Sequence, residues 1–183
     1  MNRFFALVLL LFLIPLFILI SIFILVEDRM PILFSQKRVG INYSFFKIYK
    51  FRSMKKSTPN VATHLLTNSQ KYMLKVGSVI RKLSLDELPN LLNIIKGEMV
   101  FIGPRPALYN QDDLMKLRIE AGVDKLKPGL TGWAQINGRD EISLEYKVKL
   151  EKYYMENKSM FLDIKIFILT FSTAFFKSKN ISH

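Results

Sequence analysis

Residues 4–26 read FFALVLLLFLIPLFILISIFILV, an uncharged run in which Ser21 is the only polar residue. A helix of this length would measure about 34 Å, and a bilayer core is about 30 Å thick, so the run predicts a membrane helix. A cleaved signal peptide is disfavoured because the run is too long and no small-residue cleavage pattern follows it. Pro15 lies at the midpoint, removes one backbone hydrogen bond and predicts a bend. The helix then either spans with a kink or turns back at Pro15.

The flanking charges indicate on which side of the membrane the rest of the chain lies. Only Arg3 and the terminal amine precede the run, whereas twelve basic residues and no acidic residue lie between Arg29 and Leu85. The positive-inside bias therefore predicts one cytosolic domain over residues 30–183, with residues 1–29 embedded in the membrane. Because no linker separates the two segments, the domain should lie close against the membrane surface.

The composition narrows the chemistry that this domain can perform. The net charge of +12 predicts anionic partners, which include phosphorylated small molecules, nucleic acid and acidic lipid headgroups. The sequence has no cysteine and only two histidines, which excludes a cysteine nucleophile and disfavours a His-centred triad or a multi-His metal site. Enzymatic chemistry would therefore depend on carboxylates, Tyr, Lys or a hard metal ion.

Strand and turn signals predict a small α+β domain in which helices predominate. The aromatic alternation of residues 45–51 predicts a strand, and Asn137-Gly138 predicts a turn in a loop and hairpin region over residues 127–139. Residues 57–69 are polar and contain Pro59-Asn60, so we expect an exposed loop there. The paired prolines of residues 103–106 predict an extended or turn segment.

Helices are predicted over residues 88–95, 111–121 and 140–157. A further apolar stretch, residues 161–176, contains an uncharged run that is too short to span a bilayer. It predicts either a core helix or an amphipathic helix at the membrane interface, and the pattern favours neither.

The segment Leu83-Ser-Leu-Asp-Glu-Leu-Pro-Asn90 carries the first acidic pair after the basic run. Proline is tolerated in the first helical turn, so Pro89 predicts a helix that begins around residues 85–88. Asp86 and Glu87 would then lie at a helix N-terminus, where unpaired N–H groups suit a phosphate. The alternative is structural, because Ser84 and Glu87 match the pattern of a capping box.

Three other segments are candidates for binding. In Gly103-Pro104-Arg105-Pro106 the two prolines would fix one guanidinium for an oxyanion; the alternative is a turn with a solvated Arg. Basic and aromatic residues interleave over residues 47–56, which include Lys50 and Arg52, and suit nucleic acid or anionic lipid; the alternative is a solvated basic face. The third segment is residues 131–139, which could serve a base, a sugar or a phosphate through Trp133, Gln135, Asn137 and Arg139. The alternative is a hairpin in which Trp133 simply packs.

Taken in order, these segments resemble those of the bacterial sugar transferase family, the monotopic phosphoglycosyl transferases. The resemblance covers nearly the whole chain and rests on the apolar helix with Pro15 and on residues 36–40, 46–54, 81–90, 93–106, 127–139 and 161–165. It departs from the family where Ile14 replaces the usual Ser, where Val39 replaces the usual Pro, and in a short N-terminal lead. The chain resembles the small, catalytic-core type.

The resemblance implies a reaction and roles for individual residues. Such enzymes transfer a sugar-1-phosphate from a UDP-sugar to polyprenyl phosphate, release UMP and begin the membrane steps of surface glycan synthesis. Asp86 would attack the sugar-bearing phosphate and form a covalent aspartyl-phosphosugar, and Glu87 would help hold Mg²⁺. An aspartate that is ionised at neutral pH needs no general base, and Mg²⁺ with Arg105 would relieve its repulsion by the diphosphate. The implied substrate-binding residues are Lys50, Arg52, Arg81, Pro104, Arg105, Pro106, Trp133, Gln135 and Arg139.

The resemblance also implies a location. The family's broken helix re-enters the cytoplasmic face, so it favours a re-entrant helix-break-helix at Pro15, on the inner membrane of a bacterium with anionic lipids. It favours no nucleic-acid partner and leaves room for a homodimer. The competing hypothesis is a membrane-anchored basic module that binds nucleic acid or acidic lipid, for which Asp86 would be irrelevant.

Overall fold

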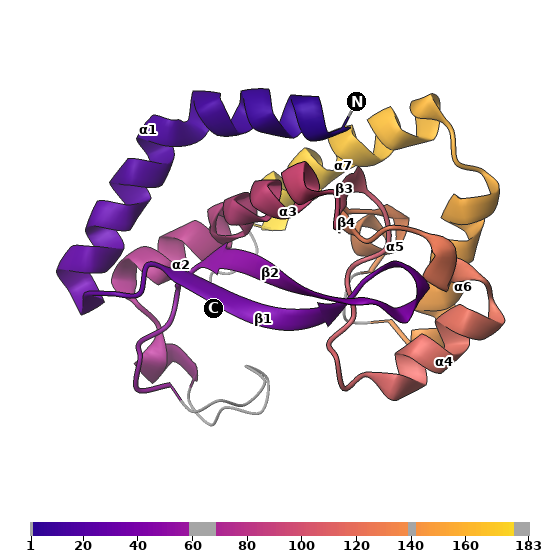
Figure 1. The fold of residues 1–183 in the computed structure, drawn as a ribbon, viewed down its shortest axis with the longest axis horizontal. Helices are drawn as coiled ribbons and strands as arrows, with labels where there is room; N and C mark the ends of the chain where they lie inside the picture. The colour runs from indigo at the N-terminus through magenta and orange to yellow at the C-terminus, as the bar shows by residue number, and fades with distance from the viewer. Residues whose placement is uncertain (1, 59–68, 139–141, 178–183) are drawn as a thin grey trace.

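The computed structural model describes residues 2–58, 69–138 and 142–177, and it confirms a mostly helical α+β fold (Figure 1). The helices are α1 (Asn2–Asp28), α2 (Lys75–Lys82), α3 (Leu91–Lys96), α4 (Asp112–Glu120), α5 (Trp133–Ile136), α6 (Leu144–Glu156) and α7 (Met160–Lys177). The strands are β1 (Leu33–Val39), β2 (Phe45–Phe51), β3 (Val100–Ile102) and β4 (Gly129–Thr131). Short 3₁₀ helices are η1 (Ile41–Tyr43), η3 (Ser69–Tyr72), η4 (Leu85–Asn90) and η5 (Val123–Lys125).

Helix α1 holds the apolar run, and in the described part of the chain it is the one helix long and apolar enough to cross a membrane. It continues from Asn2 to Asp28 with Pro15 inside it, and Figure 1 shows it bent in its middle, as the proline predicts. The expected break therefore takes the form of a bend within one helix. Most of its large side chains are exposed, while Ala6, Ile20 and Ile24 are buried against the domain.

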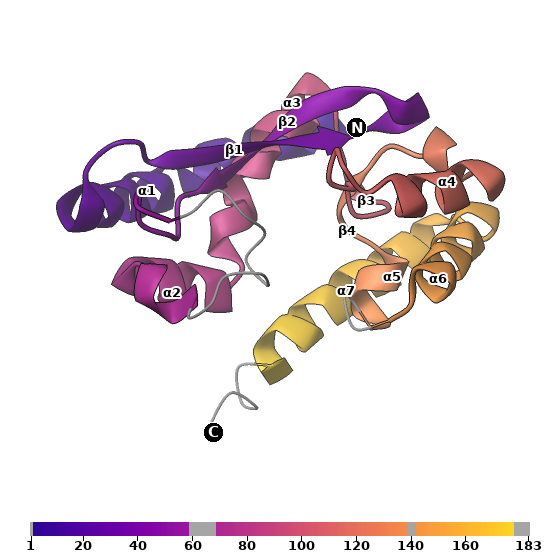
Figure 2. The same ribbon diagram turned by 90° about the horizontal axis from the view of Figure 1, so that it is seen from below.

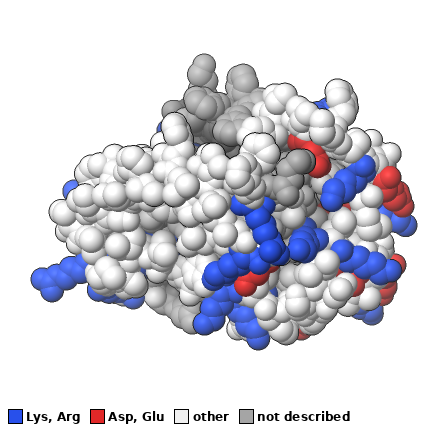
Figure 3. Space-filling view, turned by 45° about the horizontal axis from the view of Figure 1, so that its top comes forward, with Lys and Arg blue, Asp and Glu red and all other residues white. Residues whose placement is uncertain are grey.

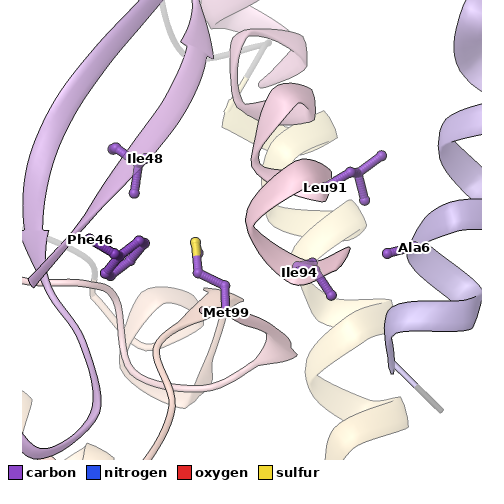
Figure 4. Close-up of a cluster of buried hydrophobic side chains, with 6 residues drawn as sticks. All are labelled: Ala6, Phe46, Ile48, Leu91, Ile94 and Met99. Atoms are coloured by element: carbon purple, nitrogen blue, oxygen red, sulfur yellow. The ribbon is translucent and has the colours of Figure 1, made fainter. Parts of the chain in front are cut away.

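Both halves of α1 pack against the same domain. Near its start, Ala6 faces Leu91 and Ile94 of α3 (Figure 4). Beyond the bend, Ile20 and Ile24 join a second apolar cluster that includes Phe51 of β2. Helix α1 is thus a layer of the fold along its length.

The end of α1 is also fixed by polar contacts. Glu27 accepts hydrogen bonds from the backbone N–H groups of Lys75 (2.6 Å) and Val76 (3.1 Å) at the start of α2. Asp28 binds the guanidinium of Arg52 at 2.7 Å. Glu27 thus gives the first turn of α2 the acceptors that it lacks within the helix, while Asp28 ties the end of α1 to Arg52 after β2.

Strands β1 and β2 form an antiparallel hairpin with a register from Leu33 opposite Phe51 to Val39 opposite Phe45. The strand predicted over residues 45–51 is confirmed with the same bounds. Phe46 and Ile48 alternate along it and pack toward α3. In Figure 2 the hairpin runs along one edge of the molecule, from the side of α1 and α2 to that of α4.

Strands β3 and β4 form a parallel pair in which Val100 and Ile102 lie opposite Gly129 and Thr131. The hairpin predicted over residues 127–139 is therefore wrong. The partner of β4 is distant in sequence, and α5 follows β4 where the return strand was expected. Backbone contact explains the glycines, since a side chain on Gly129 or Gly132 would collide with the backbone of Gly103.

The remaining helices surround this parallel pair. The prediction for residues 111–121 is confirmed by α4, and that for 140–157 by the shorter α6. The predicted helix over 88–95 is divided between η4 and α3. Most of the loop predicted over 57–69 lies outside the described residues.

Helix α7 confirms the core alternative for one face of the C-terminal stretch, and the membrane-interface alternative stays a prediction. Leu162 and Ile166 pack on Tyr154 in a buried cluster, which makes one face part of the core. Phe161 and Ile168 on the other side are exposed to 80% and 61%. The helix is a core element with an uncovered apolar face.

Candidate active site

The segment Leu83–Asn90 forms the centre of the site. The predicted start is confirmed, because η4 begins at Leu85 and leads directly into α3 at Leu91. Ser84 precedes η4 in a left-handed conformation with φ of 56°, and its side chain makes no capping hydrogen bond. The capping-box alternative is therefore wrong, and the acids at the start of η4 are available for other contacts.

Glu87 lies between two cationic side chains from different parts of the chain. Lys50 of β2 places its Nζ 2.6 Å from Glu87 Oε1, and Arg105 Nη1 lies 3.5 Å from the same oxygen. Burial alone would raise the pKa of Glu87, but Lys50 and Arg105 outweigh that effect and lower it. Glu87 is therefore held as a carboxylate.

Asp86 differs from its neighbour in environment. It is only 7% exposed. Burial is the main reason that its pKa is raised, with a further contribution from the charge of Glu87; Lys50 and Arg81 act in the opposite direction. The two acids are therefore distinct: Glu87 is paired and strongly ionised, whereas Asp86 is a desolvated carboxyl group whose negative charge is poorly neutralised.

A pocket opens beside the pair. Its walls come from the β1–β2 hairpin, η4, the Gly103–Pro106 segment and β4, and the lining residues are Arg38, Ile48, Lys50, Glu87, Asn90, Met99, Arg105, Pro106, Gly129 and Leu130. Three cations and one anion line it, so it suits an anionic ligand. Asp86 immediately precedes Glu87 in the chain, is buried and is not part of the lining. Figure 3 shows Lys and Arg side chains gathered next to the broad uncharged surface of α1.

The predicted Gly103–Pro106 segment is an irregular, non-helical stretch whose carbonyl groups are held from three sides. Pro104 accepts a hydrogen bond from Gly129 N at 2.8 Å, and Pro106 accepts one from Arg38 Nη1 at 3.1 Å. The carbonyl of Arg105 accepts a hydrogen bond from Arg118 Nη2 at 2.9 Å. The backbone that carries the Arg105 guanidinium is therefore rigidly supported.

The support from Arg118 depends on a buried ion pair. Arg118 Nε lies 2.8 Å from Glu151 Oε2, and its Nη2 binds the other carboxylate oxygen, so the pair is bidentate. The side chains are 6% and 2% exposed. Removal of either partner of so enclosed a pair would leave an uncompensated buried charge.

The structure brings together several of the predicted residues. Lys50, Glu87, Arg105 and Pro106 line one pocket, and the charge of Arg81 reaches Asp86. Pro104 contributes through its backbone to the support of Arg105, as described above.

The other predicted residues lie elsewhere. Arg52 is buried and donates to Asp28 and to the carbonyl of Arg29, so its contacts run to α1. Trp133 stacks on Tyr153 with ring centroids 5.7 Å apart and does not line the pocket. The amide atoms of Gln135 are buried with no hydrogen-bond partner in the described chain, close to where a side chain on Gly132 would lie. Arg139 lies outside the described residues.

Sequence reasoning missed Arg38 and Asn90 as pocket residues. Arg38 reaches the site through the pairing of β1 with β2, where it lies opposite Phe46. Asn90 ends the acidic segment, and its position three residues after Glu87 was the available signal.

The donor set fits a hard divalent cation that arrives with its substrate. The described residues include no cluster of three or more His, Cys, Asp or Glu side chains. Mg²⁺ does not require one, because it is commonly held by one or two carboxylates together with substrate phosphates and waters. Glu87 supplies such a carboxylate in a pocket that suits phosphates, and Asn90 Oδ1 is a buried oxygen without a hydrogen-bond partner.

Comparison with known proteins identifies the family of the chain. The model of the family described as "Bacterial sugar transferase" matches residues 1–177. The sugar transferase EpsL of Bacillus subtilis is 44% identical over 140 residues, which cover 76% of this chain and 68% of that protein. The exopolysaccharide production protein ExoY of Rhizobium meliloti is 39% identical, over 85% of this chain and 75% of its own.

A longer relative has a more specific name. The UDP-glucose:undecaprenyl-phosphate glucose-1-phosphate transferase of Escherichia coli is 36% identical over 90% of this chain, which spans only 37% of that protein. The fold and the pocket thus occur in a chain that belongs to the bacterial sugar transferase family.

Proposed function

We propose that this protein transfers a sugar-1-phosphate from a UDP-sugar to polyprenyl phosphate and releases UMP. The observation that carries the proposal is the acid pair of η4, with Lys50 of β2 and Arg105 of the Gly103–Pro106 segment gathered on Glu87. A pocket whose charged lining residues are three cations and Glu87 suits a diphosphate, and the carboxyl group of Asp86, next to Glu87 in the chain, suits nucleophilic attack on phosphorus. The product would enter the synthesis of a surface glycan.

In the first step, a carboxylate oxygen of Asp86 attacks the phosphorus that bears the sugar. A new bond forms between this oxygen and phosphorus, the phosphoanhydride bond breaks, and UMP leaves with the electron pair. Arg105 and Lys50, which line the pocket, would stabilise the charge that develops on the phosphate oxygens. The desolvated environment of Asp86 leaves its carboxylate weakly neutralised, which favours attack.

In the second step, a phosphate oxygen of the polyprenyl acceptor attacks the same phosphorus and frees Asp86. The polyprenyl diphosphosugar is the product, and no water takes part. Glu87 would hold Mg²⁺, which when bound neutralises charge on the diphosphate. Arg118 and Glu151 hold the Arg105 backbone in position throughout.

The membrane arrangement that we propose is re-entrant, with residues 1–29 embedded and residues 30–183 on the cytoplasmic face of the bacterial inner membrane. It is supported by the attachment of α1 at both halves, through Ala6 to α3 and through Ile20 and Ile24 to the β2–α2 side. A helix of 27 residues is about 40 Å long. If α1 crossed the bilayer, one of its ends would leave the domain.

Asp86→Asn tests the reaction. With UDP-sugar, undecaprenyl phosphate and Mg²⁺, the wild type should release UMP and the variant should release none. Asp113→Asn, an exposed acid on α4, is the matched control and should keep full activity. With UDP-sugar alone, the wild type should release about one equivalent of UMP, and mass spectrometry should find a phosphosugar on the peptide containing Asp86. Full activity in Asp86→Asn would end the proposal.

Cysteine labelling tests the topology, because the sequence contains no cysteine. Single cysteines at Asn2 and Lys56 should react with an impermeant maleimide in inverted membrane vesicles, and both should be protected in right-side-out vesicles. Labelling of the two positions from opposite sides would establish a spanning helix.

A further inference from the structure

Asn90 is buried in the wall of the pocket with a polar atom unused. It is 3% exposed, and its Oδ1 has no hydrogen-bond partner in the described part of the chain. A buried oxygen in this state destabilises the fold relative to an apolar side chain of the same shape. Since Oδ1 belongs to a residue that lines the pocket, a ligand can supply the missing interaction.

Asn93, one turn further along, shows what a purely structural asparagine does in this helix. Its Nδ2 donates to Lys47 O and to Glu98 Oε2, both at 2.7 Å, and its Oδ1 accepts from Tyr49 N at 3.3 Å. Every atom of that carboxamide serves to join α3 to β2 and the loop after α3. Asn90 lies on the same helical segment and makes no such use of Oδ1.

The local geometry pairs Asn90 with Glu87. Both belong to η4, a 3₁₀ helix, and side chains three residues apart eclipse one another in this type of helix. Glu87 and Asn90 therefore lie on one face, and both line the pocket. The pair offers a carboxylate oxygen and a carboxamide oxygen, which are ligands that hard divalent cations prefer.

We propose that Asn90 Oδ1 and Glu87 are the two protein oxygens of a divalent-cation site, and that the cation binds together with the diphosphate of the nucleotide. The inference rests on the proposed function and deepens it. Lys50 and Arg105 already lie on Glu87, so a cation alone would meet positive charge. A diphosphate draws these side chains to itself and supplies the remaining oxygen ligands, which makes cation and nucleotide binding mutually dependent.

The test measures that dependence with UDP and Mn²⁺ as probes. Equilibrium dialysis gives the dissociation constant of UDP for the detergent-solubilised protein, first in EDTA and then in saturating Mn²⁺, and their ratio is the coupling. Water proton relaxation in the same samples reports whether Mn²⁺ tumbles with the protein. For the wild type we expect Mn²⁺ to tighten UDP binding by about tenfold or more, a usual size for coupling between two ligands.

Three variants separate metal binding from other roles of Asn90. Asn90→Leu keeps the shape and removes the oxygen, so it should lose most of the coupling and the relaxation signal while its UDP affinity in EDTA stays the same. Asn90→Asp keeps an oxygen ligand and should retain the coupling. Asn157→Leu makes the same chemical change at an exposed position and should behave as the wild type. Thermal unfolding should show Asn90→Leu no less stable than the wild type, because the substitution removes an unpaired polar atom.

Two results would overturn the inference alone. Asn90→Leu could retain the Mn²⁺ coupling, or it could weaken UDP binding equally in EDTA and in Mn²⁺, which would make Asn90 a direct nucleotide contact. A wild type that binds no UDP under either condition would instead overturn the proposed function, and the inference with it.

Discussion

Glu151→Gln provides a strong test of the view that a buried ion pair holds the site. The substitution keeps the size of the side chain and removes its charge, which leaves the Arg118 guanidinium enclosed without a counterion. Breaking a buried pair by removal of one partner typically destabilises a protein by about 3–5 kcal/mol. For a chain of this size, 1 kcal/mol corresponds to about 2–4 °C in the unfolding midpoint, so we expect a fall of about 6–20 °C.

The effect on activity should exceed the effect on folding. Arg118 also donates to the carbonyl of Arg105, so a displaced Arg118 releases the backbone that carries the guanidinium to which we assign phosphate binding. UMP release measured well below the unfolding midpoint should therefore fall, mainly through weaker binding of the UDP-sugar. Glu156→Gln, an exposed acid at the end of the same helix, is the matched control and should change the free energy of unfolding by less than about 0.5 kcal/mol.

The double variant Arg118→Met with Glu151→Met completes the test. Replacing both charges by apolar side chains of similar volume should restore much of the stability lost in Glu151→Gln. It should not restore activity, because the hydrogen bond to the Arg105 carbonyl stays absent. A Glu151→Gln protein with an unfolding midpoint and UDP-sugar affinity equal to those of the wild type would refute the reasoning.

The remaining predictions concern the acid pair, the end of α1 and a close contact. Because burial raises the pKa of Asp86, its ionised form destabilises the native state; Asp86→Asn should therefore raise the unfolding midpoint at pH 7, and the gain should vanish as pH falls below the ordinary aspartate range. For the same reason, UMP release by the wild type should decline on the acid side at a higher pH than an exposed aspartate would give. Glu27→Ala removes two acceptors at the start of α2 and should cost about 1 kcal/mol in chemical denaturation. Gly77→Ala forces a methyl group onto the carbonyl of Ser53 and should destabilise by about 1–3 kcal/mol, whereas Ser78→Ala on the exposed side of α2 should be neutral within about 0.5 kcal/mol.

Local patterns predicted the elements whose partners are near in sequence. The bounds of β2 follow from its aromatic alternation, and its partner β1 lies six residues away across η1. The parallel pairing of β3 with β4 was not predictable in this way, because each strand has three residues and the contact joins segments far apart. The pairing requires close backbone contact between Gly103 and Gly129. The sequence shows the two glycines but does not show that they lie against each other.

The residues of the site also differ in whether a local sequence pattern could identify them. Asp86, Glu87 and Arg105 stood out because acids after a basic run, and an arginine between prolines, are unusual patterns. Lys50 and Arg52 looked equivalent, since residues two apart on a strand share a face. Strand β2 ends at Phe51, so only Lys50 points to the pocket, while Arg52 turns to Asp28. Arg38 depends on the register of the hairpin and cannot be found from local pattern alone.

Strand β2 connects helix α1 with the pocket. Phe46 and Phe51 of this strand pack in the clusters that hold the two halves of α1, while Ile48 and Lys50, between them, line the pocket. One seven-residue strand therefore joins both halves of α1 to two residues of the pocket. A change in the bend of α1 would act on the clusters that contain Phe46 and Phe51, and Lys50 lies between these two residues on the strand.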